Sequence, residues 1–181
     1  ILHSPDGIIS YQLLAEFANR NIPVIFCNEK HMPIGIYWGL NGHYQGSKRI
    51  NQQAQLSLPK RKQIWQQIVI EKIKNQATVL KAAKLDYLDL EHFASNVKSG
   101  DSDNREGIAA QAYWSRLFGP KFRRNPDLDG LNAFLNYGYA ILRAVVARGL
   151  VGSGLLPTLG VHHHNRYNAY CLADDIMEPY R

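Results

Sequence analysis

The residues best suited to chemistry lie near the end of the chain. Three consecutive histidines, His162 to His164, follow an apolar turn, and Asp174, Asp175 and Glu178 come after them in an expected helix. Imidazole and carboxylate together suit a divalent cation of the manganese, magnesium or zinc kind. Asp175 and Glu178 are three residues apart, so on a helix they share one face. One histidine and one acid are too few ligands for a catalytic metal, so we expect a third ligand from another segment.

The third ligand has a candidate with a competing structural role. Glu106 lies in the first turn of an expected alanine-rich helix, where small neighbours leave room for a ligand. The pattern Asp103-x-x-Glu106 also fits a capping box, in which the glutamate reaches back to the amide at the helix start. From the pattern alone, the capping role is favoured.

The histidines leave their own choice open. Neighbouring side chains in an extended segment face opposite ways, so either one ring or the pair His162 and His164 faces a site. For any single one of them, packing or capping is as good an explanation as metal binding. No HExxH, P-loop, GxGxxG or GxSxG pattern is present, although a Ser-His-Asp triad stays possible.

The elements that position these residues form a small sheet and a helical part. We expect a helix over 11–20 and strands over 23–28 and 34–40. Further helices are expected over 60–84, 85–93, 104–118 and 127–150, while residues 48–56 are polar and receive no element. The core stripe expected for the last helix consists of Leu131, Phe134, Leu135, Tyr139, Leu142, Val145, Val146 and Leu150.

The charge pattern indicates a polyanionic partner. The 181 residues carry a formal charge of +6, which favours nucleic acid among possible partners. One face of the helix expected over 60–84 is basic, and a charged helix face is usually just exposed to solvent. Its basic residues are Lys60, Arg61, Lys62, Lys72, Lys74, Lys81 and Lys84.

The cysteines, the apolar runs and the chain ends indicate where the protein is located and whether the sequence is part of a longer protein. Cys27 and Cys171 are distant from each other and lack CxxC spacing, which predicts reduced thiols and a cytoplasmic location. The longest apolar run is too short to span a bilayer, so no membrane association is expected. The chain starts without methionine and stops just inside a helix, which suggests a portion of a longer protein.

Three blocks carry a resemblance to a known family. They are IFCNEKHMPIG at 25–35, NREGIAAQAYW at 104–114, and the long block from Leu131 to Arg181 that contains GVHHHNRYNAY and DDIMEPYR. In this order and with these gaps, the blocks resemble the CRISPR-associated integrase of spacer acquisition, a part of antiviral defence. The form found in type II systems is the most similar.

The resemblance implies a fold and a site. It implies an α+β chain, with residues 1–43 as part of an N-terminal β-sheet domain and 44–181 as a helical metal-binding catalytic domain, truncated at both ends. The metal-binding residues of the family fall on Glu106, His163 and Glu178, with Asp175 as a possible addition. The resemblance therefore selects His163 from the triplet and overturns the cap at Glu106.

The resemblance also implies an activity and partners. It implies an endonuclease and integrase dependent on Mn²⁺ or Mg²⁺, which inserts spacers into a CRISPR array by phosphodiester transesterification. The expected partners are double-stranded DNA, as spacer ends and CRISPR repeat, a second copy of the protein, and the second CRISPR-associated adaptation protein. The residues expected to contact DNA phosphates are Arg105, Lys121, Arg123, Arg124 and Arg166.

Two alternatives belong to other classes. In a non-catalytic helical DNA-binding or scaffold module, Glu106 caps its helix and His163 packs in the core. A hydrolase of small phosphoesters requires an enclosed pocket instead of an open basic groove. Convergence of ligands from separate segments distinguishes the integrase hypothesis from the binding module.

Overall fold

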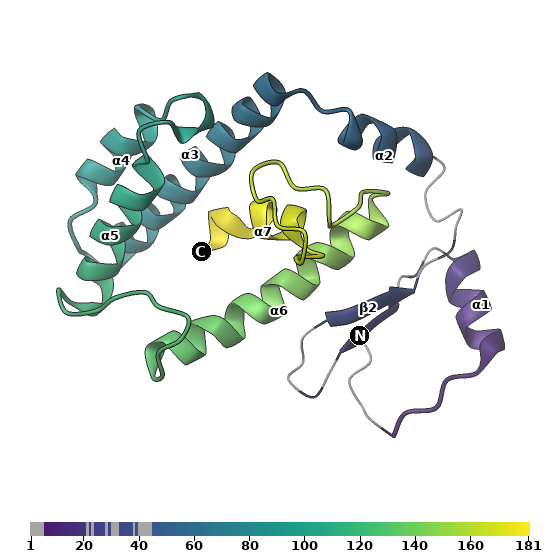
Figure 1. The fold of residues 1–181 in the computed structure, drawn as a ribbon. Coiled ribbons are helices and arrows are strands. Elements are labelled where there is room, and N and C mark those ends of the chain that lie inside the picture. The colour runs from purple at the N-terminus through teal and green to yellow at the C-terminus, as the bar shows by residue number, and fades with distance from the viewer. Residues whose placement is uncertain are drawn as a thin grey trace.

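The computed structural model describes residues 6–20, 22, 24–27, 29, 33–37, 39 and 45–181. Figure 1 shows a small sheet beside an open arrangement of helices. The α+β class predicted from the sequence is confirmed. The elements are α1 (Tyr11–Asn19), β1 (Val24–Cys27), β2 (Pro33–Tyr37), α2 (Gly46–Ala54), α3 (Leu58–Ala82), α4 (Leu88–Ser95), η1 (Ser99–Asp101), α5 (Arg105–Phe118), α6 (Leu131–Gly152), α7 (Cys171–Met177) and η2 (Glu178–Tyr180).

The two strands form an antiparallel pair. Val24 pairs with Tyr37 and Phe26 with Gly35, and the register shifts before Cys27 meets Pro33. A proline has no amide for the ladder, which accounts for an irregularity at this end. The two strands predicted over 23–28 and 34–40 are present. The boundary expected between residues 43 and 44 lies outside the described residues, so the division into domains stays a prediction.

Helix α3 is the central helix of the helical part. Ser57 precedes it in an extended conformation, and Pro59 lies in its first turn, where a proline is well tolerated. It packs against α4, α5, α7 and η2. The apolar residues of its buried face are Trp65, Ile68, Val69, Ile73, Ala77 and Leu80.

Helix α2 occupies a segment to which the sequence assigned no element. It carries no apolar stripe, and hydrogen bonds hold it to the turn after α6. Arg49 Nη1 donates to the Ser153 carbonyl at 2.6 Å. The Gln53 side chain donates to the Leu156 carbonyl at 2.8 Å and accepts from the Leu156 amide at 3.0 Å. A helix anchored by such distant contacts has no apolar periodicity for a sequence pattern to detect.

Helix α6 differs from its predicted form in start and in stripe. It begins at Leu131, after Gly130 with φ 69°, and not at Asp127. Several residues of the predicted core stripe lie at the surface, since Phe134 is 76% exposed and Leu131 and Val145 are 49% and 45% exposed. The buried residues of α6 are Asn132, Ala144, Ala147, Leu150 and Val151.

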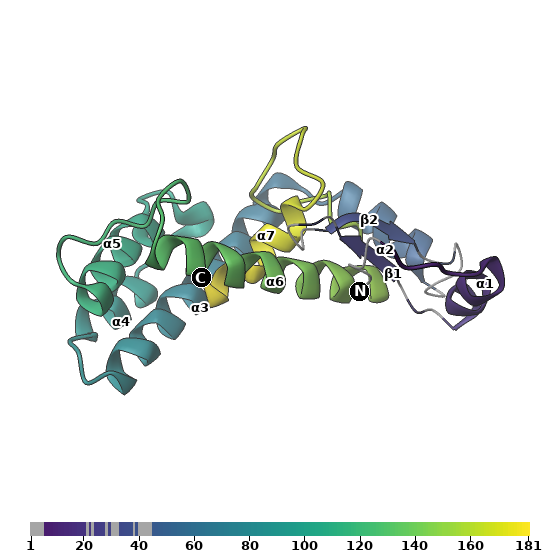
Figure 2. The ribbon, with the colours of Figure 1, turned by 90° about the horizontal axis from the view of Figure 1, so that it is seen from below.

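Helix α7 and the 3₁₀ turn η2 bring the end of the chain into the helical part. Figure 1 shows α7 between α3 and α6, and both helices pack against it. From below, Figure 2 shows the sheet and α1 at one end of an elongated molecule, with α4 and α5 at the other. The residues of α7 and η2 therefore meet the long helices near the middle of the molecule.

Candidate metal centre

Glu106 is free of any capping role because other residues cap α5. The Asp101 carboxylate accepts the amides of Arg105 and Glu106 at 2.8 and 3.1 Å. Asn104 is the N-cap, and its side chain accepts the amide of Gly107. The capping box predicted from Asp103 and Glu106 is therefore wrong. Instead, Glu106 Oε1 lies 2.6 Å from Lys72 Nζ on α3.

His163 is fixed by a carboxylate on α7. Asp175 is fully buried and accepts the amides of Val161, His162 and His163 as well as the His163 ring at Nδ1, which lies 2.7 Å away. Gly160 makes this turn possible, because a Cβ there would lie 2.3 Å from the His163 carbonyl oxygen. The loop that follows α6 is thus wrapped around one carboxylate.

The Asp175–His163 contact shifts the ionisation of both groups. Burial raises the pKa of Asp175, but hydrogen bonds from the His163 ring and from three amides outweigh burial and hold the pKa below its ordinary value. The hydrogen bond to Asp175 raises the pKa of His163 above its ordinary value, against the opposing effect of burial. With Nδ1 held in this way, Nε2 is the ring nitrogen left to bind a ligand. A carboxylate behind a histidine is the usual support for a metal ligand.

Glu178 lies at the start of η2 and is almost completely buried, at 3% exposed. Its Oε2 lies 2.5 Å from Lys72 Nζ, and its Oε1 lies 2.6 Å from Arg181 Nη1. The Lys72 ammonium therefore bridges Glu178 from η2 and Glu106 from α5. Two acids that are 72 positions apart in the chain converge on one positive charge.

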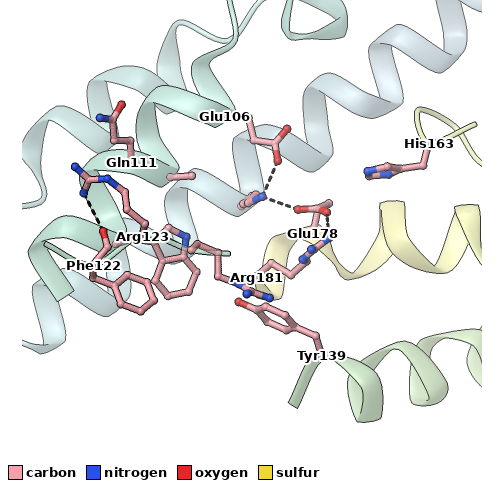
Figure 3. A pocket seen from close by; sticks show the side chains of 12 residues that line it. Glu106, Gln111, Phe122, Arg123, Tyr139, His163, Glu178 and Arg181 are labelled. Carbon is pink, nitrogen blue, oxygen red and sulfur yellow. Dashed lines mark hydrogen bonds and ion pairs between the residues drawn. The ribbon is translucent and has the colours of Figure 1, made fainter. Parts of the chain in front are cut away.

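The two acids and His163 line one cavity of about 470 Å³. Figure 3 shows the Glu106 and Glu178 side chains close together, with the His163 ring directed toward Glu178; both carboxylates contact the Lys72 ammonium. Arg123, Arg124 and Arg181 add positive charge to the lining. The other lining residues are Ala110, Gln111, Trp114, Phe122 and Tyr139.

Three observations bear on whether a divalent cation fits here. The donor set, two carboxylates and an imidazole, has the chemistry that Mn²⁺ and Mg²⁺ accept. The Lys72 ammonium already marks a point between the carboxylates that attracts positive charge. Within the part of the chain that the structure describes, no three His, Cys, Asp or Glu residues lie close enough together to hold a metal as they stand. The chemistry of the donors therefore suits a divalent cation, while the Lys72 ammonium stands between the two carboxylates.

The remaining acids of α7 have other partners. Both oxygens of Asp175 are occupied by the loop amides and His163, so it supports His163 and does not line the cavity. Asp174 forms a two-point ion pair with Arg143 of α6 and accepts from Asn168 at 2.7 Å. The role of Glu106, His163 and Glu178 as metal ligands stays a prediction.

The basic residues expected to contact DNA divide into two groups. Arg123 and Arg124 line the cavity, and Arg124 donates to the side chains of two asparagines of α6. Arg105 lies outside the lining and is held by Asp103 at 3.0 Å. Lys121 and Arg166 are exposed and also lie outside the lining.

Sequence reasoning missed several residues of the site. It placed Lys72 on the solvated face of its helix, but Lys72 is buried between the two acids. Its spacing from Ile68 and Val69, four and three residues away, was a usable indication. The stack of Trp65 on the His162 ring, with centroids 3.9 Å apart, could not be predicted either. Tyr139 was assigned to the core stripe of its helix, and Arg181 received no role, but both line the cavity.

Taken together, these features define an α+β protein whose helical part gathers two acids and a histidine from separate elements around one basic cavity. The family model described as CRISPR associated protein Cas1 matches residues 2–181, and the chain belongs to this family.

Curated relatives support this membership. The chain is 41% identical over 183 residues to the CRISPR-associated endonuclease Cas1 of Neisseria meningitidis serogroup C. The aligned region covers 100% of this chain and 60% of that protein. The chain is 29% identical to a Cas1 endonuclease of Francisella tularensis subsp. novicida, covering 95% of this chain and 60% of that protein. The chain thus spans about 60% of the length of these relatives.

Solved structures share the fold. A Cas1 protein from Thermotoga maritima matches with a TM-score of 0.70 at 22% identity, over 95% of this chain and 61% of that one. A casposase bound to an integration product matches with a TM-score of 0.66 at 20% identity, over 96% and 57%. A partial Cas6-RT-Cas1–Cas2 complex gives a TM-score of 0.66 at 25% identity, over 96% and 59%.

Proposed function

We propose that this chain is the catalytic part of a metal-dependent DNA endonuclease and integrase that inserts new spacers into a CRISPR array. Its metal, Mn²⁺ or Mg²⁺, would be held by Glu106, His163 and Glu178. The observation that carries the proposal is the convergence of Glu106 and Glu178 on one cation position, beside His163 and in a basic cavity. Family membership supports it independently.

Each residue has a task that follows from its position. Glu106 and Glu178 supply anionic oxygens from two different elements. Asp175 holds Nδ1 of His163, which leaves Nε2 directed at the cavity. Arg123 and Arg124 would contact the phosphates of the DNA backbone, which positions DNA without reading its sequence. When bound, the metal would polarise a phosphodiester and stabilise charge on the attacking or leaving oxygen.

The reaction would be a phosphodiester exchange. In integration, the 3′-hydroxyl of a spacer end forms a new bond to phosphorus while the bond from phosphorus to a 3′-oxygen of the repeat breaks. The attacking hydroxyl loses its proton to solvent, and the leaving 3′-oxygen takes up a proton from solvent to become a new 3′-hydroxyl. In the nuclease reaction, water takes the place of the 3′-hydroxyl. Neither reaction changes an oxidation state.

The partners follow from the same proposal. Double-stranded DNA would lie over the basic cavity, and the protein would act as a homodimer with the second adaptation protein. Two solved structures of the same fold support DNA and the second adaptation protein as partners, a casposase bound to an integration product and a Cas6-RT-Cas1–Cas2 complex. No helix in the described part of the chain has the length and apolar character to cross a bilayer. We further propose that the protein is located in the cytoplasm and that it is the form of this integrase found in type II CRISPR systems.

The binding-module alternative loses its main support in the structure. It required Glu106 to cap α5, whereas Asp101 and Asn104 do so. A hydrolase of small phosphoesters would require an enclosed pocket, while this cavity opens among the basic side chains of Arg123 and Arg181. Both features favour a large polyanionic substrate.

Strand transfer with a labelled spacer end and a repeat duplex in Mn²⁺ tests the proposal. His163→Ala and Glu106→Gln should each abolish product, while salt-sensitive DNA binding persists. The matched controls are His92→Ala and Glu71→Gln, which change exposed residues of α4 and α3 and should leave activity unchanged. Full activity in either site variant would refute the assignment.

A further inference from the structure

Lys72 is a charged residue buried where three elements meet. Its side chain is 9% exposed on α3, and its ammonium contacts Glu106 of α5 and Glu178 of η2 at 2.6 and 2.5 Å. Lysine is almost never buried to this extent unless it is paired. The pairing with two acids therefore explains how this residue is tolerated in the core.

The charges around Glu178 balance only when Lys72 is counted. Glu106 and Glu178 carry two negative charges, and Lys72 and Arg181 carry two positive charges. Without the ammonium, two carboxylates would face each other, one of them nearly sealed from water. Like charges in a partly buried site repel each other strongly. Lys72 thus keeps the two acids in place.

We propose that Lys72 is a positioning residue that acts as a built-in cation between Glu106 and Glu178, and that a divalent metal binds there only by displacing its ammonium. This inference rests on the proposed function. The lysine side chain is a flexible stem of four carbons, and Lys72 itself lines the 470 Å³ cavity. The ammonium therefore has open space into which it can withdraw.

The proposal predicts that Lys72 weakens metal binding while it stabilises the metal-free site. Lys72→Met removes the charge and keeps an unbranched side chain. The two carboxylates, no longer bridged by the ammonium, should then bind Mn²⁺ about tenfold more tightly than in the original chain, because Lys72 no longer competes for their facing oxygens. Lys72→Arg keeps the charge and should stay near the original affinity. A lysine that only maintained the fold would give weaker binding when removed.

The test is a titration of the 181-residue chain with Mn²⁺ in the absence of DNA, read from the electron paramagnetic resonance signal of free Mn²⁺. The matched control is Lys74→Met, which removes an exposed lysine of the same helix that pairs with Glu71 at 3.0 Å. Its affinity should not change. Equal or weaker binding by a folded Lys72→Met variant would overturn the inference.

Two further outcomes keep the inference separate from the proposed function. If neither the original chain nor Lys72→Met binds Mn²⁺, the proposed metal centre is wrong and the inference falls with it. If the original chain binds and Lys72→Met binds no more tightly, only the inference is wrong. Should Lys72→Met fail to fold, the nitrogen resonance of the Lys72 ammonium in the original chain decides. It must shift on addition of Mg²⁺, and an unchanged resonance would overturn the inference.

Discussion

Asp175→Asn should strongly destabilise the loop that carries His163. The Asp175 carboxylate accepts four hydrogen bonds, three from backbone amides and one from the His163 ring, and is fully buried. Asparagine keeps one oxygen, which can accept about two of them. Each lost bond to a charged group is worth about 1.5 kcal/mol, so the expected loss in the free energy of unfolding is about 3 kcal/mol.

Urea denaturation followed by far-ultraviolet circular dichroism measures this loss. For a chain of this size the same change corresponds to a fall in Tm of roughly 6 to 12 °C. Asp129→Asn is the matched control, because Asp129 is exposed in the loop before α6, and its effect should stay within about 0.5 kcal/mol.

A local measurement separates the loop from the rest of the molecule. Hydrogen exchange at the amides of Val161, His162 and His163 should be faster in Asp175→Asn, since each amide loses a charged acceptor. A loss of stability below about 1 kcal/mol, with unchanged exchange at these amides, would refute the idea that Asp175 organises the loop.

Three other predictions test the packing and charge of the structure. Phe134→Ala should change the free energy of unfolding by less than about 0.5 kcal/mol because Phe134 is 76% exposed. In contrast, Ile73→Ala, in the buried face of α3, should lower the free energy of unfolding by about 2 to 5 kcal/mol. Urea denaturation of both variants compares them, and equal effects would contradict the exposed position of Phe134. Gly160→Ala should lower the free energy of unfolding by about 1 to 3 kcal/mol because its Cβ would meet the His163 carbonyl oxygen at 2.3 Å. Gly149→Ala is the control and should not destabilise the protein, because there is open space around Gly149. A thermal melt in which the two variants unfold at the same temperature would contradict the tight turn at Gly160. The hydrogen bond from Arg116 lowers the pKa of Asp89 below 3.8, so its stabilising effect is present above this ordinary value and is lost as the pH falls through the folded-state pKa. Because the pair is partly exposed, Arg116→Gln should reduce the stability by about 1 kcal/mol or less at neutral pH and by nothing below both pKa values; an effect that persists in strong acid would show that Arg116 acts through packing.

The sequence predicted the elements whose own pattern determines them. The apolar period of α3 places Trp65, Ile73 and Leu80 in the core, and all three are buried. The same reasoning misplaced the stripe of α6, because periodicity identifies an apolar face but does not say which neighbour covers it. Phe134 and Val145 lie on that apolar face and are exposed in the structure.

The site was harder to predict than the fold because its contacts are distant in sequence. The pattern around Glu106 favoured a cap, and only the resemblance to a family redirected the assignment. In the structure, Asp101 takes the capping role because residues 100, 101 and 104 have positive φ and fold the chain back onto α5. Such left-handed conformations at Asp101 and Asn104 are not readable from residue type alone.

The position of Lys72 on α3 is the sequence feature that points most directly to the site. It was grouped with the solvated basic residues of α3, yet it lies at helical spacing from Ile68, Val69 and Gln76, which are all buried. A lysine on the buried face of an amphipathic helix requires anionic partners from other elements, because an unpaired buried charge is too costly. The carboxylates Glu106 and Glu178 meet that requirement. In this chain, the buried position of Lys72 on α3 therefore indicates the clustered acids Glu106 and Glu178, which neither acid indicates by its own position in the sequence.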